Sequence, residues 1–253
     1  MKAYHKNPKK RFWEIDFLRG VAIVMMIIFH FLYDLNYFAG LGFNVSFGFW
    51  RYFAYATAAI FIFLVGVSLT LSYSRAVKDK KEDNLFIKYL VRGLKIFSWG
   101  LIITVITFIL LPEGFIVFGI LHFIGVSVIL AYPFIRRVYR NLALGILFIL
   151  LGLYLGKFNF DFYWLLWLGF KPEFFYTFDY FPLLPWFGVI LAGIFFGNVL
   201  YRGHERKFNI PKIPDFIFIR ILCFLGKHSL LIYLIHQPVL IALLYFFGVK
   251  INL

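Results

Sequence analysis

Long apolar segments, separated by short polar and basic ones, dominate the pattern of this 253-residue chain. A helix that crosses a membrane needs about 20 consecutive, mainly apolar residues. Seven segments fit this requirement and predict seven spanning helices. Their predicted bounds are Phe17–Phe38, Trp50–Leu71, Leu90–Leu111, Phe115–Phe134, Leu142–Phe158, Tyr180–Tyr201 and His228–Phe247. We therefore expect an all-α, polytopic transmembrane bundle that forms a single domain over residues 1–253, with a basic tail at residues 1–15.

Two features of the apolar segments concern packing and boundaries. A further apolar stretch, Phe216–Leu225, is interrupted by Arg220 and predicts either an interfacial helix or the start of a longer last span. Gly193 and Gly197 in the sixth span have the spacing of small residues at a helix–helix contact, and we interpret them as packing residues.

The basic residues are distributed unevenly between alternate polar segments. All but four of the 26 lysines and arginines lie before or within the first span, or follow the second, fourth and sixth spans. The exceptions are Arg51, Lys157, Lys171 and Lys250. Because basic loops stay in the cytoplasm, this predicts a cytoplasmic N-terminus and an outer C-terminus in the plasma membrane. It also accounts for the net charge of +14 without a nucleic-acid partner.

Composition supports lipid as the solvent of this chain. Hydrophobic residues make up 62% of it and charged residues only 15%, which is too little polar surface for an ordinary soluble domain. The lipid bilayer is therefore an expected partner. Cys223 is the one cysteine, so no disulfide can form within the chain.

Three histidines, His30, His122 and His236, fall within predicted spans. Ionisable groups at membrane depth are costly, so each one needs a structural or functional reason. Each lies within about 4 Å of the midpoint of its predicted helix, which would place three imidazoles at one depth. The alternative for each is a buried histidine that hydrogen-bonds a neighbouring helix. Their spacing shows no paired metal-ligand motif, so we predict no metal.

The first span carries a polar stripe. Arg19 and His30 are eleven residues apart, which places them about 20° from the same face and about 16 Å apart along the axis. Asp16 lies one turn before Arg19, and Asp34 one turn after His30. An arginine at the rim can bind phosphate, and a histidine at mid-depth can act as a base or nucleophile. The alternative is an Asp16–Arg19 ion pair with one packed histidine.

Other polar positions have simpler alternatives. Arg92 and Lys95 are one turn apart near the start of the third span, where they are either a phosphate clamp or orientation charges. Gln237 precedes Pro238, which frees a backbone carbonyl or simply kinks the helix. The aromatic residues of the loop 159–180 are typical of an interfacial belt, and a sugar-stacking surface is the alternative.

Several motifs, taken in order, resemble a family of integral membrane acyltransferases. An arginine, ten residues and a histidine, here Arg19 and His30, is the recurring signature of their first helix. The further motifs are Phe61–Leu69, Phe118–Gly125, Pro185–Gly188 and Gly226–Leu230, followed by Tyr233, His236, Gln237 and Pro238. Over nearly the whole chain, these motifs are similar to the prokaryotic family grouped with the heparan-alpha-glucosaminide N-acetyltransferase catalytic domain.

The resemblance implies acetyl-CoA as a cytoplasmic donor and an amine or hydroxyl of a sugar or glycan as the acceptor on the other side. It implies that Arg19 binds the CoA phosphates and that His30 is the catalytic histidine. Where relatives often carry a second pair of arginines, this chain has Arg92 and Lys95. Animal glucosaminide enzymes place the working histidine in the loop after the first helix, but residues 39–49 contain none, so the role falls to His30.

The resulting hypothesis is acyl transfer within the bundle. Arg92 and Lys95 help Arg19 to anchor CoA. His30 deprotonates the acceptor or transiently takes the acyl group, and Asp34 orients His30. The remaining candidates stabilise the thioester oxyanion or bind substrate; they are His236, Gln237 and His122. A proton-coupled transporter that uses the histidine and aspartate chain is one alternative, and a non-catalytic scaffold is another. The acceptor, the acyl chain and the oligomeric state stay open.

Overall fold

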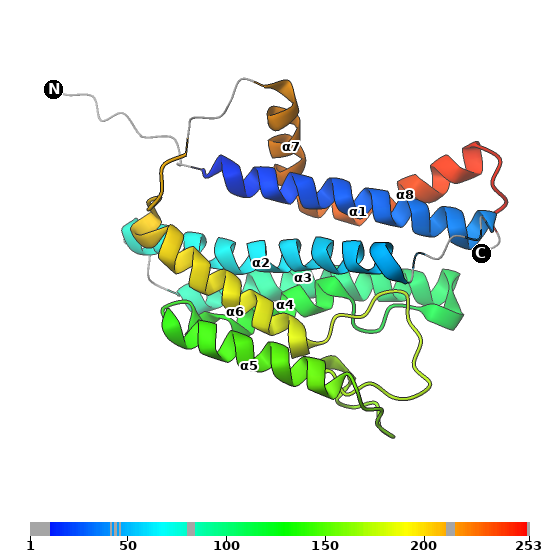
Figure 1. Ribbon diagram of the computed structural model, residues 1–253, viewed down its shortest axis with the longest axis horizontal. Helices are drawn as coiled ribbons and strands as arrows, with labels where there is room; N and C mark the ends of the chain where they lie inside the picture. Colours follow the sequence, from blue (N-terminus) through cyan, green and yellow to red (C-terminus); the bar gives the residue numbers. More distant parts are fainter. Residues whose placement is uncertain are drawn as a thin grey trace. The chain divides into compact units, whose positions relative to one another are not determined.

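The chain is mainly helical in a computed structural model that describes residues 11–40, 42, 45, 47–79, 84–210 and 216–251. These residues form eight α-helices (Figure 1). The helices are α1 (Trp13–Ala39), α2 (Gly48–Lys78), α3 (Leu85–Leu110), α4 (Ile120–Leu130), α5 (Tyr139–Leu155), α6 (Leu183–Leu200), α7 (Ile217–Lys227) and α8 (Ser229–Phe246). The predicted all-α class is confirmed.

The helices agree with about seven spans. Five of those in the described ranges, α1, α2, α3, α6 and α8, are long and apolar enough to cross a membrane. The helices α4 and α5 are shorter, with 11 and 17 residues; α4 lies within the fourth predicted span, and α5 overlaps the fifth but begins and ends three residues earlier. The chain is thus a multi-pass integral membrane protein.

The extra apolar stretch forms a helix of its own. The helix α7 ends at Lys227, and α8 starts at Ser229 after a break at His228, whose φ and ψ are −103° and 17°. The stretch is therefore not the start of a longer last span.

The chain divides into two compact units. Unit 1 comprises Met1–Ile60 and Ile210–Asn252, and unit 2 is built from Phe61–Asn209. The helix α2 contributes to both units. The single domain over residues 1–253 stays a prediction. Of its basic tail, residues 1–10 lie outside the described residues, and α1 begins at Trp13.

In unit 1, α1 packs against α7 and α8 (Figure 1). The contact with α7 is closest at two glycines. A Cβ atom added to Gly20 would lie 2.0 Å from the carbonyl oxygen of Leu222, and one added to Gly226 would lie 1.7 Å from that of Asp16. Backbone meets backbone at this crossing, so neither position has room for a side chain.

In unit 2, α6 packs against the second half of α2 through Gly193 and Gly197. A Cβ atom on Gly193 would lie 2.2 Å from the carbonyl oxygen of Phe63, and one on Gly197 would lie 2.0 Å from the Thr70 hydroxyl oxygen. The predicted packing role of these two glycines is confirmed.

The fourth predicted span is not a single helix. Its first five residues, 115–119, are not helical, and α4 begins only at Ile120. Backbone groups at membrane depth must be hydrogen-bonded by the protein. The Thr104 hydroxyl donates to the carbonyl oxygen of Ile116 at 2.6 Å, and the Ile116 amide donates to the Thr107 hydroxyl at 3.0 Å. Two threonines of α3 therefore replace part of the missing helical hydrogen bonding.

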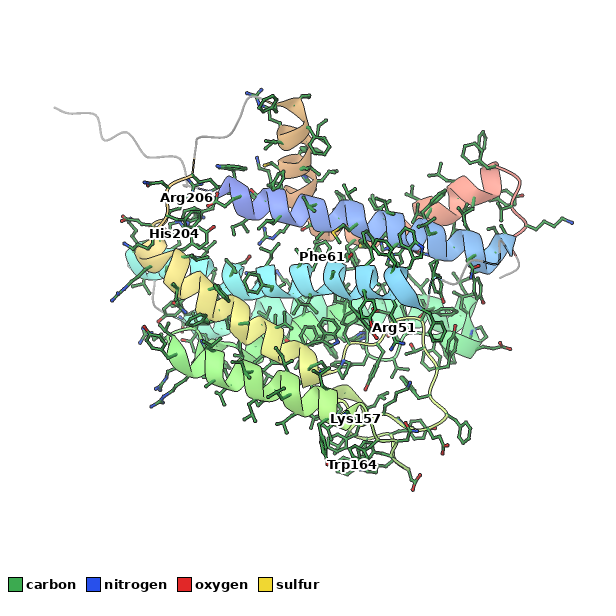
Figure 2. The ribbon with its side chains drawn as sticks, viewed as in Figure 1. Arg51, Phe61, Lys157, Trp164, His204 and Arg206 are labelled. Carbon is green, nitrogen blue, oxygen red and sulfur yellow. The ribbon has the colours of Figure 1, made fainter. Side chains whose placement is uncertain are left out.

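The basic segments of unit 2 meet at one end of the unit. Arg136, between α4 and α5, donates a hydrogen bond to the Tyr73 hydroxyl of α2. Lys78 at the end of α2 forms an ion pair of 3.1 Å with Glu205, which follows α6. Figure 2 shows Lys157, after α5, at the opposite end of the unit. The uneven distribution of basic residues along the sequence thus corresponds to an uneven distribution between the two ends of unit 2.

Candidate functional site

The histidines of α1 and α8 meet in unit 1. The ring centroids of His30 and His236 are 4.7 Å apart, and the ring planes are inclined by 82°. His236 is 9% exposed, and His30 is half-buried. The structure therefore brings together two of the three histidines that the sequence singled out.

Hydrogen bonds fix the tautomers of this histidine pair. His30 Nδ1 lies 2.9 Å from the carbonyl oxygen of Met26, and His236 Nδ1 lies 2.5 Å from that of Tyr233. A carbonyl oxygen can only accept, so each neutral ring carries its proton on Nδ1. In both rings, Nε2 then holds a lone pair that can take a proton.

Asp34 and Gln237 extend the same α1–α8 contact. The Gln237 side-chain amide donates to Asp34 Oδ1 at 2.7 Å, and Asp34 is only 2% exposed. Asp34 was expected to hydrogen-bond His30, but it pairs with Gln237 because both side chains project into the same helix contact. His30 is held by Met26 instead.

Three buried polar atoms of this cluster have no hydrogen-bond partner among the described residues. They are Asp34 Oδ2, Gln237 Oε1 and His236 Nε2. Given the hydrogen bonds above, all three are acceptors. A buried polar group without a partner costs about 1–3 kcal/mol, which a ligand with several donors would recover. His236 has already used its one N–H donor and Gln237 one of its two, so acceptors outnumber donors here, which favours recognition of N–H or O–H groups over binding of an oxyanion.

An ionic cluster lies near the start of α1. Asp16 accepts from Arg11 Nε at 2.7 Å and from Arg11 Nη2 at 3.1 Å, and Arg19 Nη1 lies 3.5 Å from the same carboxylate. The Asp16–Arg19 ion pair, which the sequence offered as the alternative for this part of α1, is present. The sequence analysis did not single out Arg11, although a basic residue five positions before a buried aspartate was a usable signal. Because Arg11 makes the bidentate contact, it compensates most of the charge of Asp16.

His122 has a different environment in unit 2. It lies in the first turn of α4, so the prediction that it sits near the middle of a helix is wrong, because the helix starts later than expected. The Gly119 amide donates to His122 Nδ1 at 3.3 Å, and His122 Nε2 lies 3.4 Å from the Thr104 hydroxyl oxygen. That hydroxyl donates to Ile116, so it accepts from Nε2. Both ring nitrogens are thus engaged in holding the start of α4; the predicted role of His122 in substrate binding stays a prediction.

Arg92 and Lys95 also belong to unit 2. Both side chains are exposed on α3, one turn apart, as the sequence predicted. Their role in binding phosphate stays a prediction.

Asp179, which the sequence analysis did not single out, holds the other side of the α4 start. Its Oδ2 accepts from the Ile120 amide at 2.9 Å, although the two residues are far apart in sequence. Burial raises the pKa of Asp179 from its usual value of 3.8 to about 6, and the hydrogen bond from Ile120 opposes this shift. No local sequence pattern predicts a cap that comes from another segment.

Comparison with known proteins adds one match. The family model described as "Heparan-alpha-glucosaminide N-acetyltransferase, catalytic" matches residues 11–238. These residues include the whole α1–α8 cluster. They also include the basic residues that were predicted to bind phosphate, which are Arg19, Arg92 and Lys95. Searches of curated proteins and of solved structures found no match.

Proposed function

Because the chain belongs to the heparan-alpha-glucosaminide N-acetyltransferase catalytic family, we propose that it transfers an acetyl group from acetyl-CoA within the membrane. The family indicates membrane acetyltransferase activity. The observation that carries the proposal to particular atoms is the pair of Nε2 lone pairs on His30 and His236, beside two buried oxygen acceptors, Asp34 Oδ2 and Gln237 Oε1, that have no partner among the described residues.

In the proposed reaction His30 is the general base. Its Nε2 takes a proton from an amine or hydroxyl of the acceptor, whose nitrogen or oxygen then attacks the thioester carbonyl. The new C–N or C–O bond forms as the C–S bond breaks. The CoA sulfur leaves as a thiolate and recovers the proton from His30, so the base is regenerated. His30 is the better exposed of the two histidines, which suits this role.

Asp34, Gln237 and His236 are the proposed acceptor site. Their unpartnered atoms accept hydrogen bonds, and the sugar or glycan acceptor is rich in N–H and O–H donors. A ligand that satisfies all three atoms would hold its nucleophile beside His30. In this mechanism His122 has a structural role, because both of its nitrogens are already hydrogen-bonded.

Arg19 is the proposed ligand of the CoA phosphates. It lies eleven residues before His30 on α1, or about 16 Å along the axis. A pantetheine arm of similar length would bring the thioester from this rim to the histidine pair. Arg92 and Lys95 are proposed as further phosphate ligands. Neither the transporter nor the scaffold alternative gains support from the family or from the geometry.

The test is acetyl transfer by purified protein in lipid nanodiscs, followed as CoA thiol release with a panel of amino sugars and oligosaccharides. We expect His30→Ala to lower the rate about 10²–10⁴-fold while the affinity for acetyl-CoA is retained. His228→Ala is the matched control, because His228 Nδ1 also bonds the carbonyl four residues earlier, at 2.9 Å, but is exposed. Equal activity of the two variants would refute His30 as the base.

Donor binding is measured separately by calorimetry. Arg19→Ala should weaken acetyl-CoA binding, whereas Arg51→Ala, which removes an exposed arginine near the start of α2, should not. If wild-type protein binds no acetyl-CoA although it melts cooperatively, the proposed function fails as a whole.

A further inference from the structure

The helix α7 has a length and a setting that spanning helices do not share. Its 11 residues extend about 16 Å, roughly half of the hydrocarbon core of a bilayer. It is separate from α8, and it runs across α1 rather than along it (Figure 1). Since α1 crosses the membrane, a helix that runs across it lies along the membrane plane.

The side of α7 that faces α1 is made of small and medium residues. Leu222, Cys223 and Gly226 are buried, and the close backbone contact at Gly20 locks this side to the first turns of α1. The helix α7 therefore meets α1 at the position of Gly20 along the α1 axis, next to Arg19.

The side opposite to α1 is apolar and exposed. Ile217, Ile221 and Phe224 lie within about 40° of one line along the helix, and their side chains are 71%, 49% and 59% exposed. Exposed apolar side chains on a helix attached to a membrane span are suited to contact with lipid.

The two remaining flanks of α7 differ in polarity. Arg220 and Lys227 share one flank, seven residues apart. Phe218 and Leu225 share the other, each about 160° from its basic counterpart. With one side against α1, a helix in the membrane plane has one flank toward the headgroups and one toward the acyl chains. The basic and apolar flanks match these two environments.

We propose that α7 is an in-plane membrane helix at the bilayer interface nearest the start of α1, and that Arg220 and Lys227 bind anionic phospholipid headgroups. Phe218 and Leu225 then point into the acyl chains. Anchoring of this kind sets the depth of the whole unit. If Gly20 lies at the interface, His30 lies ten residues deeper, about 15 Å, which is the middle of a core about 30 Å thick.

The depth of single positions tests this proposal. Nitroxide labels are placed at positions 218, 220 and 224 in a Cys223→Ser background, and the protein is studied in nanodiscs of phosphatidylcholine with phosphatidylglycerol. We expect collisions with oxygen to dominate at position 218 and collisions with a soluble nickel complex to dominate at position 220. A depth that changes steadily from 218 to 224 would show a spanning helix and overturn the proposal. Low collision rates with both reagents at 224 would show that protein covers this face, and would overturn it as well.

Lipid retention tests the headgroup contact. The double variant Arg220→Gln/Lys227→Gln should retain less phosphatidylglycerol after detergent extraction than wild type, measured by native mass spectrometry. Lys207→Gln/Lys250→Gln removes the same charge from exposed positions elsewhere and is the control. Equal retention in the two double variants would refute headgroup binding. Neither measurement depends on catalysis, so the proposal stands or falls separately from the acetyltransferase activity.

Discussion

At the scale of single residues, the hydrogen bonds of imidazole and amide groups decide which chemistry the α1–α8 cluster can perform. His30 and His236 both donate Nδ1–H to carbonyls of their own helices. Gln237 donates its amide to Asp34. Apart from the second N–H of Gln237, the cluster leaves acceptors and bases available, which suits a ligand that brings hydrogen-bond donors.

The sequence predicted the members of this cluster but not their pairing. His30, Asp34 and His236 stand out because ionisable groups are costly at membrane depth. Which nitrogen of each ring carries the proton depends on side-chain torsions, and these are not encoded in residue spacing. The same limit applies to His122, whose hydrogen bonds to Gly119 and Thr104 depend on where α4 begins.

Asp179 gives a prediction about stability and pH. Its pKa of about 6 in the folded protein lies above the unfolded value, so the folded state binds more protons between about pH 4 and pH 6. The free energy of unfolding therefore falls as the pH rises through this range. Asp179→Asn keeps an acceptor for the Ile120 amide and removes the titration, so it should be more stable than wild type at pH 7 by about 1–3 kcal/mol.

Thermal melting of the two proteins from pH 4.5 to pH 8 checks this effect. The difference in melting temperature should be small at pH 4.5 and should reach its full value above pH 6.5. Asp161→Asn, an exposed aspartate of the same loop, is the control and should follow wild type. A constant difference between Asp179→Asn and wild type at every pH would show that Asp179 does not titrate in this way.

At the scale of helices, the length of each apolar segment predicted well that a helix is present. It predicted less well where that helix begins and ends. Seven predicted spans correspond to seven helices, with ends that differ by a few residues in most cases. The larger differences are the end of α2, seven residues later than predicted, the start of α3, five residues earlier, and the start of α4, five residues later. Before the start of α4, Thr104 and Thr107 of α3 bond the backbone of Ile116, and the periodicity of a single segment carries no information about such outside partners.

The α1–α7 crossing gives a prediction about packing. Gly226→Ala would place a Cβ atom 1.7 Å from the carbonyl oxygen of Asp16, and backbone cannot move aside as a flexible side chain can. We expect a loss of about 1–3 kcal/mol in the free energy of unfolding, measured by thermal or denaturant melting in detergent. Gly156→Ala is the control, because its nearest neighbour would lie at 3.3 Å, and it should change stability much less.

The variant Gly226→Ala also tests whether this packing matters for function. Because α7 holds the segment that carries Asp16 and Arg19, Gly226→Ala should weaken acetyl-CoA binding even at temperatures where the protein is folded. Unchanged stability and unchanged binding in this variant would mean that the two helices do not meet as closely as described.

At the scale of the whole molecule, the distribution of charge predicts the orientation in the membrane. In unit 2 the basic segments meet at one end, and Lys157 lies at the other (Figure 2). In a Cys223→Ser background, Lys207→Cys should react with a membrane-impermeant maleimide only from the cytoplasmic side. Lys157→Cys should react only from the outer side.

Both labelled positions are exposed on the protein. A cysteine that does not react from one side is therefore shielded from the reagent by the membrane and not by burial in the protein. Reaction of both cysteines from one side would contradict the predicted topology. The sequence could predict this asymmetry because it depends on counts of residues between spans. It could not predict that the first and last helices share a unit, because their contact joins opposite parts of the chain.

That discontinuous unit has a consequence for biosynthesis. Ribosomes add about 5–20 residues per second, so the stretch between the end of α1 and the start of α8 takes roughly 10–40 s to make. During this interval α1 is already available for insertion, while His236 and Gln237 do not yet exist. The nascent protein must therefore keep the Asp34 carboxyl in the bilayer, or delay its entry, until its partner arrives. Translation that stops before Ser229 leaves Asp34 without Gln237 for good, so a truncated chain keeps an unpaired carboxyl at membrane depth.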